Sequence, residues 1–144
     1  MTLQRLNEHL NMLLQLQAAK EALGSMKAQI LGAANSDGMP HGHEVSRTTE
    51  NLAILLQKQI DDVNRMERIV ESSEKEVREF VDSIEDNRTQ LIFNLRFLCG
   101  MKWAAVAIMI GGGNTEKAVK STCYRFLNCG EDEICSEESR SGAC

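Results

Sequence analysis

The strongest constraint on the fold is a long apolar repeat in the middle of the chain. Between residues 45 and 84, twelve positions follow one another at alternating steps of four and three, and nine of them are apolar. Such a period, kept for more than five heptads, is typical of a helix that packs along another helix. We therefore predict one long helix from about Glu44 to Asp86. The twelve positions hold Val45, Thr49, Leu52, Leu56, Gln59, Val63, Met66, Val70, Ser73, Val77, Phe80 and Ile84.

A second helical stripe precedes this repeat and predicts a helix from about Thr2 to Leu31, in which His9 is expected at the surface. Residues 32–43 hold three glycines and the one proline, so they predict a loop. Residues 1–86 are therefore expected to form an antiparallel helical, coiled-coil hairpin. Further apolar residues widen the face of the second helix, so we expect it to contact more than one neighbour. They are Ile54, Leu55, Ile60 and Ile69.

Composition favours an all-α protein. Aromatic residues make up only 4% of the 144 residues, which is too few for an ordinary β-sandwich or barrel. No stretch approaches the length of a membrane span, and the N-terminus lacks the pattern of a secretory signal. We therefore expect a cytoplasmic protein with no membrane partner.

The net charge of −5 conceals a basic block. Residues 44–86 carry twelve acidic and six basic side chains, whereas residues 87–127 carry six basic side chains and one acid. Residues 128–144 are acidic again and predict a disordered tail. Because screening confines electrostatic attraction to roughly 8 Å, a polyanion responds to the local basic block rather than to the net charge.

The basic block predicts three short helices, the last two joined by a glycine-rich turn, which is a helix-turn-helix pattern. We expect the first helix to end near Gly100 and the second near Gly111. Asn114 is the expected N-cap of the third helix. The residues expected to face the core are Leu91, Ile92, Leu95 and Leu98, then Trp103, Val106, Ala107 and Ile110, then Val119, Cys123, Phe126 and Leu127.

The remaining positions of this module suit contact with duplex DNA. Lysine and arginine neutralise phosphates, and short or hydroxyl side chains let a helix approach base edges. Glu116 is the one acid; it can accept from a cytosine amino group or stabilise the helix N-terminus. The predicted DNA-binding residues are Arg88, Lys102, Thr115, Lys117, Lys120, Ser121, Tyr124 and Arg125.

This part of the chain also resembles a known family. The run from Leu91 to Leu127 resembles the helix-turn-helix of sigma-factor region four, and residues 38–127 as a whole are similar to RinA/ArpU-like regulators of phages and prophages. The resemblance implies a phage-encoded, DNA-binding transcriptional regulator that acts in the bacterial host. Seven residues separate Gly111 from Val119, where the family pattern has about five. The matching positions are Arg96, Leu98, Gly100, Trp103, Val106, Ala107, Gly111, Val119 and Lys120.

Other functions remain as alternatives. The chain could be a non-enzymatic phage protein that binds a host protein, such as RNA polymerase or a defence nuclease of the CRISPR type, or a coiled-coil adaptor. We expect no enzyme activity, no cofactor and no metal site, because no cysteine pair has zinc-knuckle spacing and Gly111–Gly113 lacks the phosphate-loop pattern. The five cysteines are expected to be reduced, and the chain to form a homodimer.

Overall fold

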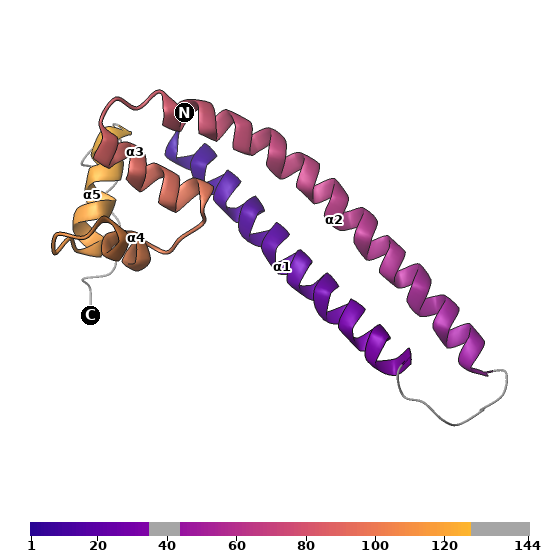
Figure 1. The fold of residues 1–144 in the computed structure, drawn as a ribbon. Helices are drawn as coiled ribbons and strands as arrows, with labels where there is room; N and C mark the ends of the chain where they lie inside the picture. The colour runs from indigo at the N-terminus through magenta and orange to yellow at the C-terminus, as the bar shows by residue number, and fades with distance from the viewer. Residues whose placement is uncertain (35–43, 128–144) are drawn as a thin grey trace, which may run out of the picture. The chain divides into compact units, whose positions relative to one another are not determined.

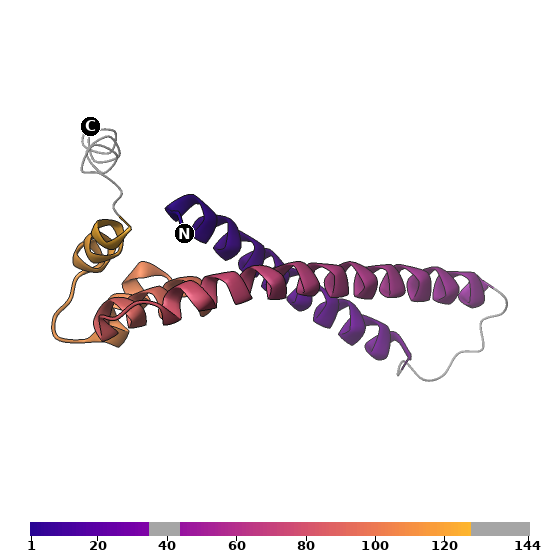
Figure 2. The ribbon, with the colours of Figure 1, turned by 90° about the horizontal axis from the view of Figure 1, so that it is seen from above.

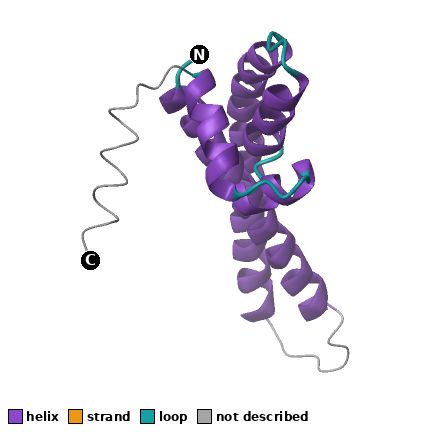
Figure 3. Ribbon diagram, turned by 90° about the vertical axis from the view of Figure 1, so that its left-hand side faces the viewer, coloured by secondary structure: helices purple, strands orange, loops and turns teal. Residues whose placement is uncertain are grey.

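The computed structural model describes the backbone of residues 1–34 and 44–127, and the side chains of residues 1–32 and 50–127. Every regular element within these ranges is helical (Figure 3). The predicted all-α fold, with a helical hairpin and a small helical module, is thus confirmed. The elements are α1 (Leu3–Ala34), α2 (Glu44–Asp82), α3 (Asn87–Phe93), the π-helical turn η1 (Asn94–Leu98), α4 (Trp103–Ile110) and α5 (Glu116–Phe126).

The chain divides into two compact units, and the boundaries between them fall inside α1 and α2. We call residues 12–72 the hairpin unit, and residues 1–11 together with the chain from Ser73 onward the module unit. No helix in the described part of the chain has both the length and the apolar character that crossing a membrane requires.

The hairpin unit packs α1 against α2 in antiparallel directions (Figures 1 and 2). Leu16, Val63 and Val70 form its buried centre, and the Lys20 ammonium lies 2.7 Å from the Glu67 carboxylate. Val63 and Val70 belong to the predicted repeat, so the repeat does face α1 here. Half-buried side chains complete the cluster: Met12, Leu13, Ala19, Leu23 and Met66.

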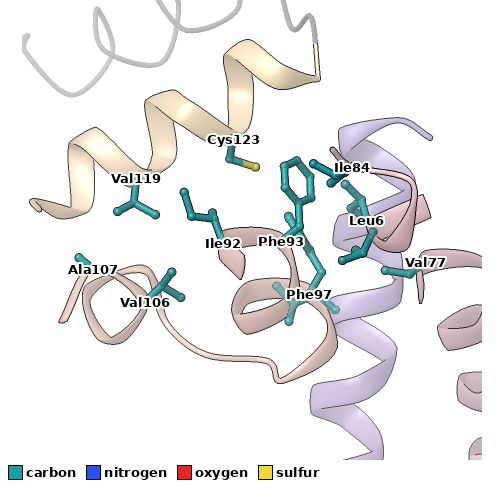
Figure 4. Close-up of a cluster of buried hydrophobic side chains, with 12 residues drawn as sticks. Leu6, Val77, Ile84, Ile92, Phe93, Phe97, Val106, Ala107, Val119 and Cys123 are labelled. Carbon is teal, nitrogen blue, oxygen red and sulfur yellow. The ribbon is translucent and has the colours of Figure 1, made fainter. Parts of the chain in front are cut away.

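The module unit has its own core, to which α1, α2, α3, η1, α4 and α5 all contribute buried side chains (Figure 4). Leu6 of α1 and Val77 of α2 join the same cluster as the aromatic rings of Phe93 and Phe97. These rings lie 5.7 Å apart between centroids, close enough for a favourable aromatic contact. The module's core is therefore completed by the first turns of α1 and the last turns of α2.

Two predicted helix ends need correction. α1 continues to Ala34 rather than ending at Leu31, and α2 ends at Asp82 rather than Asp86. The helix stops early because Asp86 is the N-cap of the next helix, so its backbone is extended. Loop residues 35–43 and the predicted tail, residues 128–144, lie outside the described residues.

His9 is buried, although we predicted a surface position. Its ring is fully shielded from solvent, and its Nδ1 lies 3.0 Å from the hydroxyl oxygen of Ser73. The other ring nitrogen, Nε2, is buried without a hydrogen-bond partner. Burial lowers the pKa of His9, and nearby Arg5 acts in the same direction, while Glu74 and the backbone of Phe97 oppose the shift.

We predict that acidification destabilises the module unit through His9. An unfolded histidine has a pKa of about 6.5. Because the pKa of His9 is lower in the folded chain, the unfolded chain binds a proton more readily below that pH. The free energy of unfolding should therefore fall as the pH drops below about 6.5 and stay level above it. Urea unfolding followed by the fluorescence of Trp103, the single tryptophan, measures this at pH 7.5 and 5.5.

The matched variant is His9→Gln, which keeps a hydrogen-bonding side chain but does not titrate. Its stability should change less than that of the wild-type chain between the two pH values. His41 and His43 are present in both proteins, so their titration cancels in the comparison. An equal loss of stability in both proteins would contradict the role assigned to His9.

Candidate nucleic-acid interface

The module begins with a tightly capped helix. The Asp86 carboxylate accepts a hydrogen bond from the Thr89 backbone N–H at 2.9 Å and a second one from the Thr89 hydroxyl. These bonds lower the pKa of Asp86, because they stabilise the ionised carboxylate. The cap fixes the direction of α3, which buries Ile92 and Phe93. Leu91, which we predicted to face the core, is instead 44% exposed.

After α3 the backbone widens into the π-helical turn η1, and Arg96 lies within it. The guanidinium of Arg96 donates to the backbone oxygen of Met101 at 2.7 Å and lies 4.8 Å from the centroid of the Trp103 ring. Burial lowers the pKa of Arg96, which keeps its charge nonetheless. Arg96 and Trp103 are both half-buried, and their contact holds the start of α4.

The turn between α4 and α5 depends on its glycines. Gly111, Gly112 and Gly113 all have φ near +70°, a left-handed region that other residues avoid. The Asn114 side chain donates to the backbone oxygen of Gly111 and accepts from Arg88 at 2.6 Å. The turn is therefore tied both to the end of α4 and to the first turn of α3.

The N-cap of α5 is Thr115, not Asn114 as we predicted. The Thr115 hydroxyl oxygen accepts from the backbone N–H of Ala118 at 3.2 Å. Thr115 has the extended backbone that an N-cap requires, while the Asn114 side chain is already bonded to Gly111 and Arg88. Thr115 was predicted to contact DNA, and in the structure its hydroxyl caps the helix.

α5 has one buried and one exposed side. Val119 and Cys123 are fully buried against the module core; in Figure 4 Val119 points toward α4 and Cys123 toward Phe93 of α3. Lys117, Ser121 and Arg125 follow one another at steps of four, so they share a different face of the helix. Lys117 and Arg125 are exposed, and Ser121 is half-buried. We call these three residues the α5 stripe.

Lys120 and Tyr124, which were also predicted to contact DNA, lie beside other side chains of the same unit. The Lys120 ammonium lies 2.8 Å from the Glu116 carboxylate, an ion pair across one helical turn. The ring of half-buried Tyr124 packs edge-on against Trp103, with 6.3 Å between centroids. Phe126, which we expected in the core, is 45% exposed, although its ring centroid lies 5.5 Å from that of Phe93.

Four of the predicted contact residues are cations that the structure exposes to solvent. Lys102, at the N-terminus of α4, is exposed like Lys117 and Arg125. Arg88 is exposed as well, but its guanidinium donates to Asn114. The sequence reasoning missed Arg96 and Asn114 as the residues that hold the helices in place. Arg96 was part of the family pattern but had no assigned role, and Asn114 was expected to cap α5 rather than to bind Gly111 and Arg88.

No group of three or more His, Cys, Asp or Glu side chains in the described ranges could hold a metal ion. Of the five cysteines, Cys99 is exposed and Cys123 is buried, whereas Cys129, Cys135 and Cys144 lie outside the described residues. Comparisons of the chain with protein-family models, with curated proteins and with solved structures each found no match.

We predict that Gly111→Ala destabilises the module. Gly111 combines φ 71° with ψ −163°, a backbone conformation essentially restricted to glycine, so a Cβ atom should cost about 1–3 kcal/mol in free energy of unfolding. Nothing lies within 4 Å of the added Cβ, so backbone strain is the sole cause. Urea unfolding followed by Trp103 fluorescence measures the loss.

Gly24→Ala is the matched control. Gly24 lies inside α1, is exposed and also has nothing within 4 Å of an added Cβ. Because alanine favours a helix, this change should stabilise the chain by about 0.5–1 kcal/mol, measured by far-UV circular dichroism. If Gly111→Ala were as benign as Gly24→Ala, the backbone assigned to the turn would be wrong.

Proposed function

We propose that the chain binds duplex DNA through α4, the glycine turn and α5. The observation that carries the proposal is the division of α5 into a buried side, Val119 and Cys123, and a stripe that presents two exposed cations and a hydroxyl. From Lys117 to Arg125 the stripe extends about 12 Å along the helix axis. A major groove about 12 Å wide admits a helix of this kind.

The cations of the module are suited to different parts of a duplex. Lys117 and Arg125 on α5 are exposed, so they can neutralise phosphates and release counterions. Lys102 at the start of α4 offers a third exposed cation for a flanking phosphate. Ser121, between the two stripe cations in sequence, can bond to a base edge or a phosphate oxygen.

The biological role that we infer is transcriptional regulation by a phage-encoded protein in the bacterial cytoplasm. It rests on the resemblance of residues 38–127 to RinA/ArpU-like regulators, in which Trp103 and Arg96 are part of the shared pattern. Two copies of the chain would bind two half-sites, because a two-fold symmetric protein suits a palindromic operator.

One observation favours a second candidate, in which the module binds a host protein. Ile108 and Met109 are adjacent on α4, and 79% and 61% of their surfaces are exposed. Apolar side chains gain little from phosphates, but they are common at the centres of protein interfaces. RNA polymerase or a defence nuclease of the CRISPR type would be such a partner.

We predict salt-dependent binding that needs the α5 stripe. Fluorescence anisotropy with labelled duplexes from the DNA upstream of the gene, and with a scrambled duplex, should show weaker binding at 200 mM than at 50 mM salt. Counterion release sets this dependence, and removing one cation that neutralises a phosphate should reduce the salt slope by about one. Lys117→Ala/Arg125→Ala should therefore bind more weakly and depend less on salt.

The control is Lys27→Ala/Lys75→Ala, which changes the net charge equally but removes exposed lysines of α1 and α2. It should bind as the wild-type chain does. Equal losses in both double variants would indicate attraction by net charge alone, and no binding at 50 mM would exclude the DNA proposal. Ile108→Ser/Met109→Ser, tested for loss of a host protein that co-purifies with the chain, addresses the second candidate.

We also predict that Glu116→Gln tightens DNA binding. The carboxylate repels phosphates and holds the Lys120 ammonium in an ion pair, so its removal leaves that cation free to reach the duplex. The gain should shrink as salt rises. Glu21→Gln, at an exposed position of α1, makes the same change in net charge and should leave the affinity unchanged. Weaker binding by Glu116→Gln would instead point to a contact between Glu116 and a cytosine amino group.

A further inference from the structure

One side of α2 in the hairpin unit carries exposed apolar side chains that α1 does not cover. Leu55 is 54% exposed and Ile69 is 52% exposed, and Ile54 beside Leu55 is 67% exposed. Isolated apolar side chains are normal on protein surfaces, but these recur along one helix. The arrangement of these side chains along α2 indicates which kind of partner they fit.

Leu55 and Ile69 belong to a second stripe, displaced by one position from the repeat that faces α1. The second stripe also advances in steps of three and four, so it runs along one side of α2, about 100° around the helix from the repeat. All of its members are exposed or half-buried. We call Leu55, Lys58, Asp62, Arg65 and Ile69 the outer stripe of α2.

The outer stripe has the same order of side-chain types in both directions. Asp62 stands at its centre, one cation follows on each side, and Leu55 and Ile69 lie seven residues before and after Asp62. A two-fold axis next to Asp62 therefore brings Leu55 of one antiparallel helix opposite Ile69 of the other. A two-fold interface requires this kind of self-matching surface, in which each contact occurs twice.

The charges in the centre fit the same arrangement. The axis places the two Asp62 carboxylates, each with 42% of its side chain exposed, next to each other, and Lys58 and Arg65 of both copies lie about one helical turn to either side. Arg65 has 72% of its side chain exposed and already lies 3.5 Å from Asp62 of its own helix, so a shared charge network needs only a small rearrangement. The four cations offset the repulsion between the two carboxylates, while the apolar ends supply the burial.

We propose that a second copy of this chain docks on the outer stripe, α2 against α2 in antiparallel directions, with Leu55 of each copy on Ile69 of the other. The inference deepens the proposed function, because it rests on the homodimer included there. The interface is tested by measuring the mass of the protein in solution without DNA. A failure of DNA binding and a failure of this interface are therefore separate results.

The experiment measures the mass of the full chain by analytical ultracentrifugation over a range of concentrations. The wild-type chain should reach twice the 16.1 kDa of one copy. Leu55→Glu and Ile69→Lys should each be monomeric, because each places a charge against an apolar partner. Asn64→Glu, at an exposed position of α2 outside the outer stripe, should remain dimeric. Circular dichroism checks that every variant keeps its helical content.

The decisive sample is a mixture of the Leu55→Glu and Ile69→Lys chains. An antiparallel pair puts the new glutamate opposite the new lysine and keeps one native Leu55–Ile69 contact, so the mixture should recover the dimer mass. Three results would overturn the proposal: a monomeric wild-type chain, variants that remain dimeric, or a mixture that stays monomeric. The last of these would be expected of a parallel pair, in which Leu55 faces Leu55.

Discussion

The module unit depends on the burial of two phenylalanine rings, Phe93 and Phe97. Three short helices of about forty residues enclose too little apolar surface to be stable alone. The two rings extend the core toward Leu6 of α1 and Val77 of α2, which are buried in the same cluster. The position of α5 is thus set by a core whose contacts begin in the first turns of the chain.

The sequence predicted the helices well, because their signals are local. The apolar period of α2, the positive-φ residue Gly100 and the glycine turn each act through neighbours a few positions away. The buried face of α3 was predicted less well. The period of 3.6 pointed to Leu91, which is exposed, and missed Phe93 and Phe97, which are buried. Phe97 lies in the π-helical turn, which shifts the phase of the helix.

The candidate site was harder to predict, because its partners are distant in sequence. Composition identified six basic side chains in the module but could not assign their contacts. Arg96 lies over the ring of Trp103 and donates to the backbone oxygen of Met101. Arg88 donates to the side chain of Asn114, which is 26 residues away. The burial of His9 was not predicted for the same reason. Its partner, Ser73, is 64 residues away, and a polar residue on an apolar repeat does not reveal what it binds.

The inclusion of Leu6 and Leu10 in the module's core has a consequence for how the chain folds. These residues leave the ribosome before the rest of the cluster that they join, which also needs Val119 and Cys123. The hairpin unit can form while synthesis continues, because its contacts lie within residues 12–72. The module unit cannot close until α5 has emerged. The proposed DNA-binding surface would therefore become active only on chains that have been completed through α5, and interrupted translation products would carry the hairpin alone.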